Sequence, residues 1–289
     1  MKNLRDYNFV ILGSTGWIGK NFVEILSSLD LNLFLFSNKE NKTFHIKNKK
    51  FQSSKIDNLQ CLNIENIVLI DLAFPTQEQI LKLGNKEYSR QLNSLIEIKE
   101  KYINENQISH IFVSSSGAVY SEGNLYSEGK RNQEEFYAKY TSLNDTSLDV
   151  LRIFACIGPH YNKTGEYAFS SFMANAQNGN SIKINSRSHV LRSYVYIPHI
   201  VTFFIENLIN EREEKKQTID AVQQVLEIRE LANLIAEVYG VKVLDNLDLN
   251  KVSSKDIYSS KDNKFIEFLK SKNINHEITK KEIISSEIY

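Results

Sequence analysis

A tyrosine and a lysine that could together move a proton stand four residues apart, at Tyr126 and Lys130. If this segment is helical, both side chains project from the same face, one turn apart. A cation beside a phenol favours the phenolate, so the phenol becomes a usable proton donor and acceptor near neutral pH. Tyrosine and lysine are both common in this chain, so the pair could also stand at this spacing by chance. The surrounding motifs decide between a catalytic pair and a chance pair.

A glycine-rich turn near the N-terminus is the second chemical feature. The apolar run Asn8–Leu12 predicts a buried strand, and residues 20–29 have the apolar spacing of a helix. Between them lie Gly13, Gly16 and Gly19. This arrangement places a pyrophosphate on the amides of a helix N-terminus, although the spacing differs from the general G-x-G-x-x-G fingerprint. An ordinary glycine-rich loop is the alternative, but with only 11 glycines in the chain, three at period three favour a binding loop.

Alternating strand-like and helix-like segments surround these motifs. Apolar runs predict strands, and helical spacing predicts helices, in the following segments: strands at 33–36, 67–73, 109–113 and 148–153, and helices at 88–102, around Tyr126, and at 228–239 with Gly240 as C-cap. In the helix at 88–102 we expect Lys99 and Lys101 to point outward. Repeated β-α-β units of this kind predict an α/β fold with a doubly wound, Rossmann-type parallel sheet.

Composition excludes several classes of partner. Lysine plus arginine equals aspartate plus glutamate at 35 each, so no global basic field predicts a nucleic acid. Cys61 and Cys156 are the only cysteines and lack metal-like spacing, which fits a reducing compartment and predicts no metal. No apolar stretch approaches the ~20 residues of a membrane span, and the start lacks a signal-peptide core. We therefore expect a cytoplasmic protein; a homodimer is one assembly that the sequence leaves open.

Taken together, these residues resemble the short-chain dehydrogenase/reductase superfamily, and in particular its extended branch, whose members modify nucleotide sugars. Residues 151–160 are similar to the L-R-x-x-N-x-x-G-P motif of that branch, and residues 192–200 are similar to its R-D-F-x-x-V-D-D motif. With the glycine loop and the Tyr126/Lys130 pair, four motifs follow in the family's order over about two hundred residues. The resemblance implies an NAD(P)-dependent nucleotide-sugar oxidoreductase.

The resemblance also divides the chain into parts. We expect residues 1–160 to form the dinucleotide-binding domain. Residues 161–289, where the pattern becomes irregular, would form a smaller C-terminal substrate-binding part that is partly interleaved with the first. The charged tail at 251–289 is expected to lie on the surface.

The family's functional residues carry over to specific positions. The implied catalytic residues are Ser116, Tyr126 and Lys130, with Ser115 left open as the alternative serine, since serines at a strand end often bond only to their own backbone. The implied cofactor-binding residues are Gly13, Ser14, Thr15, Gly16, Trp17, Ile18, Gly19, Ser37, Asn38, Lys39, Leu72, Ala73, Tyr126 and Lys130. The implied contacts to a nucleoside-diphosphate sugar are Ser115, Ser116, Ala155, His160 and Arg192, with Arg192 on the diphosphate. A lone histidine after a turn, such as His160, is more often a structural residue.

The end of the second predicted strand bears on the choice of cofactor. NAD-specific sites usually carry an acidic residue there, which binds the ribose 2′-hydroxyl. This chain has Ser37, Asn38 and Lys39, and no acid until Glu40. These residues favour NADP(H), and NAD(H) is the alternative.

Positions at which this chain differs from the family's motifs limit the reactions that it could catalyse. Gly117 and Ala118 occupy the place of the Asp-Glu pair of nucleotide-sugar dehydratases, Ala155 replaces a common Asn, and His199 replaces an Asp. The short gap between Ser116 and Tyr126 also indicates an altered sugar pocket.

Hydride chemistry at one carbinol or ketone centre remains. We predict an NADPH-dependent reductase of a keto-sugar on a nucleoside diphosphate, in polysaccharide (surface-glycan) or deoxysugar biosynthesis. An NAD-dependent nucleotide-sugar 4-epimerase is the first alternative. A catalytically silent dinucleotide-binding regulator is the second, against which the presence of both Tyr126 and Lys130 counts.

Overall fold

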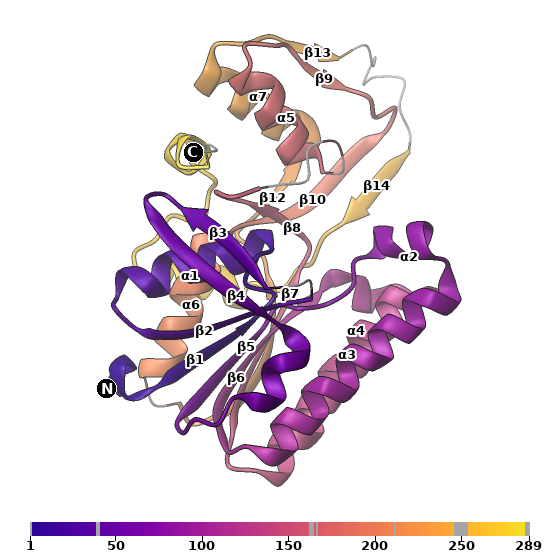
Figure 1. Cartoon of the computed structure of the whole chain (residues 1–289). Helices are drawn as coiled ribbons and strands as arrows, with labels where there is room; N and C mark the ends of the chain where they lie inside the picture. Colours follow the sequence, from indigo (N-terminus) through magenta and orange to yellow (C-terminus); the bar gives the residue numbers. More distant parts are fainter. Residues whose placement is uncertain are drawn as a thin grey trace. The chain divides into compact units, whose positions relative to one another are not determined.

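The computed structural model of the chain describes residues 2–38, 41–161, 165, 167–210, 212–245 and 254–286. The chain forms two compact units, each made of two separate stretches (Figure 1). Unit 1 contains Met1–Arg152 and Val201–Ile219, and unit 2 contains Ile153–Ile200 and Asp220–Tyr289.

Unit 1 is built around an eight-stranded sheet with the strand order β11-β7-β6-β5-β1-β2-β4-β3. Its strands are β1 (Asn8–Leu12), β2 (Asn32–Ser37), β3 (Lys42–Ile46), β4 (Lys49–Lys55), β5 (Ile67–Asp71), β6 (Ile108–Ser116), β7 (Ser147–Ile153) and β11 (Lys216–Ala221). Its helices are η1 (Leu4–Asp6), α1 (Trp17–Ser28), η2 (Ile56–Cys61), α2 (Gln77–Leu83), α3 (Asn85–Glu105), η3 (Gly117–Tyr120), α4 (Leu125–Leu143) and most of α6 (Ile197–Ile209).

The sheet reverses its strand order at β1. This strand pairs in parallel with β2 on one side and with β5 on the other, and β5 continues in parallel to β6. The predicted doubly wound parallel sheet is therefore confirmed. In open α/β sheets, ligands bind outside the carboxyl ends of the strands at such a reversal.

A hairpin, β3 and β4, lies between β2 and β5 in the chain and was not predicted. β4 is parallel to β2, and β3 runs antiparallel to β4 as the last strand at this edge. Lys42, Lys49 and Lys50 of the hairpin are exposed. Charged side chains on an edge strand discourage pairing with another chain.

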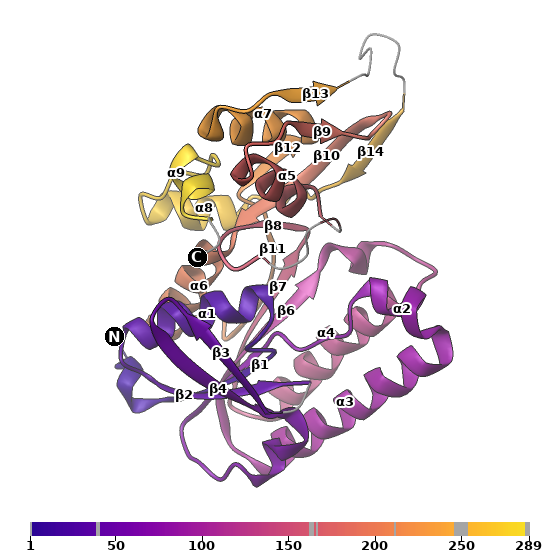
Figure 2. The ribbon, with the colours of Figure 1, turned by 45° about the horizontal axis from the view of Figure 1, so that its top comes forward.

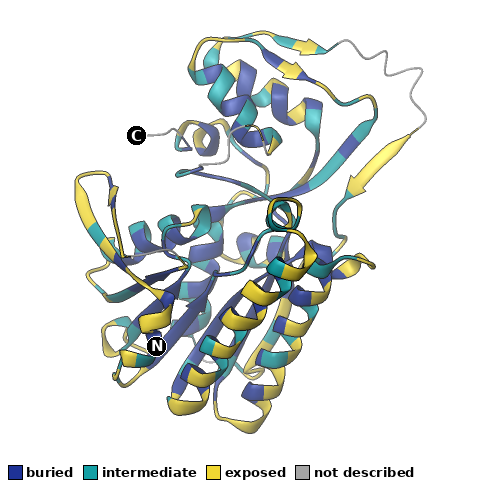
Figure 3. Cartoon of the chain, turned by 45° about the vertical axis from the view of Figure 1, so that its right-hand side comes forward, coloured by how far each residue is buried: buried dark blue, intermediate teal, exposed yellow. Residues whose placement is uncertain are grey.

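Alternate residues of the central strands face helices on opposite sides of the sheet. In β1, Phe9 contacts Phe204 of α6 edge to face, and Phe22 of α1 contacts the same ring. Val10 and Leu12 instead belong to a buried cluster with residues of α3 and α4. Figures 1 and 2 show α3 and α4 side by side, and Figure 3 shows buried strands behind helices whose outer surfaces are exposed. Because successive side chains of a strand point to opposite faces, the sheet has one buried core on each face.

Lys99 corrects one expectation. It does not point outward: the side chain is buried and bonds to Asp71, whereas Lys101 is exposed as expected. Lys99 lies on the same stripe of α3 as the buried residues Tyr88, Leu92, Leu95 and Tyr102. These residues follow one another at steps of three and four, which keeps them on one face of a helix. The spacing of Lys99 from its apolar neighbours therefore indicated that its side chain points inward.

Unit 2 contains a four-stranded sheet, with the order β12-β10-β14 and β8 paired to β10, and a two-stranded sheet of β13 and β9. Its elements are β8 (Ala155–Ile157), α5 (Ala168–Gln177), β9 (Ile182–Ile184), β10 (His189–Tyr196), β12 (Gln224–Glu227), α7 (Ile228–Tyr239), β13 (Val243–Asp245), β14 (Lys255–Tyr258), α8 (Lys264–Ser271) and α9 (Lys280–Ile284). Gly240 ends α7 with φ of +66°, which confirms the predicted C-cap.

The remaining predicted elements are present. The strands expected at 8–12, 33–36, 67–73, 109–113 and 148–153 are β1, β2, β5, β6 and β7, and the expected helices are α3, α4 and α7. The expectation of a surface-lying tail was wrong, because Phe265, Leu269 and Ile283 are fully buried. The lysines of α8 and α9 are exposed, whereas Glu282 of α9 is buried and accepts from Gln223. Among the described residues, no helix combines the length and apolar character that crossing a membrane requires.

Candidate active site

The glycine loop after β1 is too tight for side chains. Gly13 has φ of +83°, and a Cβ on it would lie 2.9 Å from the backbone carbonyl of Leu72. A Cβ on Gly19 would lie 2.1 Å from the oxygen of Gly13. Both positions therefore require glycine.

The same loop leaves the N-terminus of α1 without a capping side chain. Gly16 is the N-cap residue, makes no side-chain hydrogen bond, and no acidic residue lies in the first turn. The first amides of a helix need acceptors, and an anion can supply them. The backbone from Gly13 to Gly19, with Thr15, Trp17 and Ile18 partly exposed, thus fits the pyrophosphate of a dinucleotide.

Ser14 is the exception in the loop. Its side chain is buried and donates to the oxygen of Phe36, 3.0 Å away, and lies 2.9 Å from the hydroxyl of Ser53. These contacts tie the loop to the ends of β2 and β4. Ser14 therefore positions the loop through its side chain.

Leu72 and Ala73 follow β5 directly beside the loop. The amide of Leu72 bonds to the oxygen of Leu12 at 3.0 Å, which brings the carboxyl ends of β1 and β5 together. The amide of Ala73 donates to Asp71 Oδ1 at 3.2 Å. The two residues border the edge of the sheet that a dinucleotide would cross.

The end of β2 carries no carboxylate among the residues that the structure describes there. Ser37 is buried and Asn38 is exposed, whereas Lys39 and Glu40 lie outside the described residues. Burial, and then the charge of Lys42, lower the pKa of Lys20, which lies in the first turns of α1. The positive charge of Lys42 at the start of β3 thus acts on the ammonium group of Lys20.

Tyr126 and Lys130 both lie on α4, so the helical premise of the sequence analysis holds. The helix begins after Asn124, whose side chain accepts from the amide of Ser127 at 2.8 Å. The ring of Tyr126 packs edge to face on Phe74, with 5.8 Å between ring centres. Lys130 Nζ lies 4.0 Å from the centre of the same ring. One aromatic ring therefore contacts both residues.

Lys130 is almost completely buried. Its Nζ donates to the oxygen of Ser114 at 2.7 Å and to Gln133 Oε1 at 3.1 Å. Burial lowers its pKa to about 7, partly opposed by the charge of Asp71. A lysine in this state can hold or release a proton at physiological pH.

The serines at the end of β6 have different partners. Ser115 donates its hydroxyl hydrogen bond to Glu134, which in turn forms an ion pair of 2.6 Å with Arg152. Ser116 Oγ accepts from the amide of Ala118 at 3.2 Å and caps η3. Both serines thus have hydrogen-bond partners, and the choice between them as the reacting serine stays a prediction.

Sequence reasoning missed a group of buried polar residues beside Lys130. These residues are Asp71, Lys99, Gln133 and Tyr137. Asp71 interrupts an otherwise apolar strand, and Gln133 and Tyr137 follow Lys130 at steps of three and four on α4. A charge inside an apolar run was the signal that could have found the cluster.

The expected substrate residues belong to unit 2. Ala155 is half-buried on β8, and His160 follows that strand with φ of +66°. Arg192 on β10 forms an ion pair with Asp256, with 2.7 Å between Nη2 and Oδ2. The guanidinium that we expected on a diphosphate thus already holds an anion. His199, at the family's Asp position, lies 3.2 Å from Gln223 Oε1.

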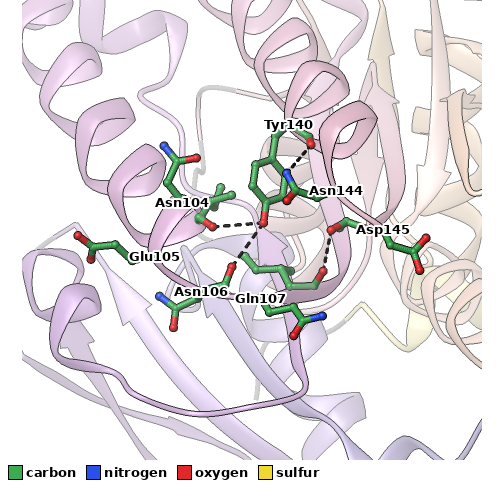
Figure 4. A pocket seen from close by; sticks show the side chains of 10 residues that line it. Asn104, Glu105, Asn106, Gln107, Tyr140, Asn144 and Asp145 are labelled. Carbon is green, nitrogen blue, oxygen red and sulfur yellow. Dashed lines mark hydrogen bonds between the residues drawn. The ribbon is translucent and has the colours of Figure 1, made fainter.

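A pocket of about 430 Å³ lies at the opposite end of β6, where α3 and α4 end (Figure 4). The hydroxyl of Tyr140 donates there to the oxygens of Ile103 and Asn106, at 3.2 and 3.4 Å. β6 spans nine residues, so at ~3.3 Å per residue the pocket is ~26 Å from Ser116. It is separate from the catalytic candidates. The described residues contain no cluster with the composition of a metal site.

Comparisons with known proteins bear on the fold and on the family that the chain resembles. The model of the NAD dependent epimerase/dehydratase family matches residues 101–221. UDP-glucuronic acid decarboxylase 3 of Arabidopsis thaliana is 24% identical over 221 residues, which cover 68% of this chain and 64% of that protein, just under two thirds. The UDP-glucose 4-epimerase of Thermus thermophilus, solved with NAD, has a TM-score of 0.70 at 14% identity, with 97% of both chains covered.

The matched segment and the similar folds agree with the resemblance to the extended short-chain dehydrogenase/reductase superfamily that the sequence motifs indicated. The fold extends over the whole chain: the UDP-N-acetylglucosamine 4-epimerase of Methanobrevibacter ruminantium has a TM-score of 0.64 at 21% identity, with 99% of both chains covered.

Proposed function

We propose that the protein is an NADPH-dependent reductase of a keto-sugar carried on a nucleoside diphosphate. The observation that carries this proposal is the charge at the end of β2. The charge of Lys42, at the start of β3, adds to burial in lowering the pKa of Lys20, and no carboxylate of the described residues forms an ion pair with either lysine. A 2′-phosphate would neutralise this repulsion, whereas the 2′-hydroxyl of NAD would not.

Unit 1 supplies the groups for the reaction. NADPH, when bound against the glycine loop, supplies the hydride. Tyr126 donates a proton to the carbonyl oxygen of the sugar, and Ser116 hydrogen-bonds the same oxygen. Lys130 stabilises the phenolate that remains, and its pKa of about 7 allows it to exchange protons under working conditions. One cofactor is consumed for each sugar reduced.

Unit 2 supplies the expected recognition of the sugar nucleotide. Arg192 holds Asp256 through two nitrogens, at 3.1 and 2.7 Å, in the fork geometry that a diphosphate also accepts. Relatives of similar fold were solved with UDP-glucose and with UDP-N-acetylmuramic acid, which supports a nucleoside diphosphate as the handle. We propose that the ligand displaces Asp256 from Arg192.

A 4-epimerase that retains NAD is the second candidate. It is favoured by the names of the similar structures, several of which are 4-epimerases, one of them solved with NAD. The two candidates differ in the cofactor and in whether it is released after each cycle.

Cofactor titration tests the proposal. We expect NADPH to bind more tightly than NADH, as followed by nicotinamide fluorescence. Lys20→Met and Lys42→Met should each weaken NADPH about tenfold, since a charge-assisted contact is worth ~1.5–3 kcal/mol, and leave NADH unchanged. Lys50→Met, an exposed change in the same hairpin, is the control. Tighter binding of NADH by the unaltered protein would contradict the proposal.

A further inference from the structure

A closed network of polar side chains lies behind Lys130, inside unit 1. Asp71 Oδ2 accepts from Lys99 Nζ at 2.8 Å, from Gln133 Nε2 at 2.8 Å and from the hydroxyl of Tyr137 at 2.7 Å. All four side chains are buried. Asp71 comes from the end of β5, Lys99 from α3, and the other two from α4.

Among the described residues, Gln133 is what connects Lys130 to this carboxylate by hydrogen bonds. The amide of Gln133 donates to Asp71 at one end, and its oxygen accepts from Lys130 Nζ at 3.1 Å at the other. A carboxylate takes only donors, and an ammonium takes only acceptors, so this amide has one orientation. Gln133 is thus a bridge of fixed direction between the two charges.

The network contains one carboxylate and two ammonium groups. Lys99 forms the direct ion pair with Asp71 and also donates to the oxygen of Ala73 at 2.6 Å. Lys130 is left with neutral acceptors, the oxygens of Ser114 and Gln133, and with the ring of Phe74. Buried charge without a direct counter-ion is costly, so the arrangement disfavours the proton on Lys130.

We propose that Gln133 is a positioning residue that fixes Lys130 Nζ for its role beside Tyr126. The Asp71–Lys99 ion pair holds Gln133 in turn and keeps the carboxylate from pairing with Lys130. The inference rests on the proposed function for the role of Lys130, but the arrangement itself can be tested without cofactor or sugar.

The charged and titratable groups around Lys130 define what each substitution should do. Besides Asp71 and Lys99, these are Glu134, which is paired with Arg152, and the phenols of Tyr126 and Tyr137 on the same helix as Lys130. The charge of Asp71 raises the pKa of Lys130, and that of Lys99 lowers it. Removing Lys99 should therefore favour the proton, and removing the Gln133 acceptor should disfavour it.

The experiment is an NMR titration of full-length protein labelled with ¹³Cε-lysine, with the Lys130 signal assigned by Lys130→Arg. We expect Lys130 to titrate near pH 7 in the unaltered protein. Lys99→Met should raise its midpoint by about one unit or more, and Gln133→Met should lower it. Lys101→Met, two residues along the same helix and exposed, is the matched control and should change nothing.

Lys99→Met and Gln133→Met are independent variants, so the test still gives a result if one of them fails to fold. In Lys99→Met, Asp71 keeps Gln133, Tyr137 and the Ala73 amide as donors, and Lys130 remains nearby as a cation. Gln133→Met is read independently if Lys99→Met does not fold. A Lys130 midpoint near the ordinary lysine value in the unaltered protein, or one that either folded variant leaves unmoved, would overturn the inference.

Turnover distinguishes this inference from the proposed function. If both hold, the pH at which turnover changes should shift in the same direction as the Lys130 midpoint in each variant, while cofactor affinity at low pH stays within a few-fold. A purely structural network would lower turnover equally at every pH, which contradicts the positioning role. Absence of any NADPH-dependent turnover, with the midpoints shifted as expected, would overturn the proposed function alone.

Discussion

At the scale of single residues, Phe74 links the two side chains that could carry the reaction. Its edge contact with Tyr126 and its face contact with Lys130 hold both on one side of α4. The hydroxyl of Ser115 donates to Glu134, and that of Ser116 accepts from the amide of Ala118.

Replacing Tyr126 by Phe removes only the ionisable hydroxyl. We expect turnover of the keto-sugar to fall by ~10²–10⁴-fold, the usual contribution of general acid catalysis, while NADPH affinity barely changes. Tyr140→Phe, on the same helix but at the far pocket, is the control and should retain turnover. Steady-state kinetics with a parallel fluorescence titration measures both quantities. Turnover that survives in Tyr126→Phe would remove this residue from the mechanism.

The sequence predicted the Tyr126/Lys130 pair because its spacing is local, but not the neighbours that surround Lys130. Asp71 is 59 positions before Lys130 and Lys99 is 31 before it, so only the packing of β5 against α3 and α4 brings them together. The spacing of α3 did mark Lys99 as inward. Lysine usually prefers an exposed position, so a buried lysine is not expected from its residue type. Its buried counter-ion, Asp71, lies on another element and cannot be predicted from the sequence of α3 alone.

At the scale of elements, the close approach of β1 to β5 creates the glycine loop. The loop can be recognised from the sequence because only glycine tolerates this approach. Gly13 has a positive φ, and a side chain on Gly19 would collide with the carbonyl oxygen of Gly13. The β3–β4 hairpin was not foreseen, since its lysines and polar residues mask the alternation of a strand. Its importance lies in Ser53, which contacts Ser14 and so supports the loop.

Gly19→Ala should show how tightly the loop is packed. The added methyl would stand 2.1 Å from the Gly13 oxygen, so backbone must move, and overpacking of this kind costs ~1–3 kcal/mol. We expect a lower free energy of unfolding and at least tenfold weaker dinucleotide binding. Gly16→Ala, whose methyl would meet the same oxygen at 3.3 Å with φ of −75°, should cost far less stability. Chemical denaturation of the two variants side by side makes the comparison, and equal losses would refute it.

At the scale of the whole molecule, the chain assembles two units from interleaved segments. The doubly wound sheet of unit 1 was predictable, because its apolar strands alternate with helices along the sequence. Unit 2 was not, because its short strands pair over long separations, as when Val190 in β10 meets Asp256 in β14. The same pairing brings Asp256 to Arg192, a partner that no local motif could indicate.

Arg192→Ala tests whether unit 2 carries the substrate site. We expect affinity for a nucleoside-diphosphate sugar to fall by about one to two decades, from the loss of charge-assisted hydrogen bonds worth ~1.5–3 kcal/mol, with NADPH binding intact. Arg187→Ala, an exposed arginine of the same unit, is the control. Calorimetric titration with a panel of nucleoside diphosphates reads the effect. Unchanged affinity in Arg192→Ala would mean that the substrate class is wrong.

The most direct test of the reductase proposal is the stoichiometry of cofactor consumption. Purified protein is mixed with NADPH and a panel of nucleoside-diphosphate keto-sugars, and NADPH oxidation is followed together with the sugar products. We predict that one NADPH is oxidised for each keto-sugar reduced, and that no reaction occurs without added cofactor. Interconversion of two nucleotide sugars by protein that carries tightly bound NAD, with no cofactor added, would contradict the reductase and establish the epimerase.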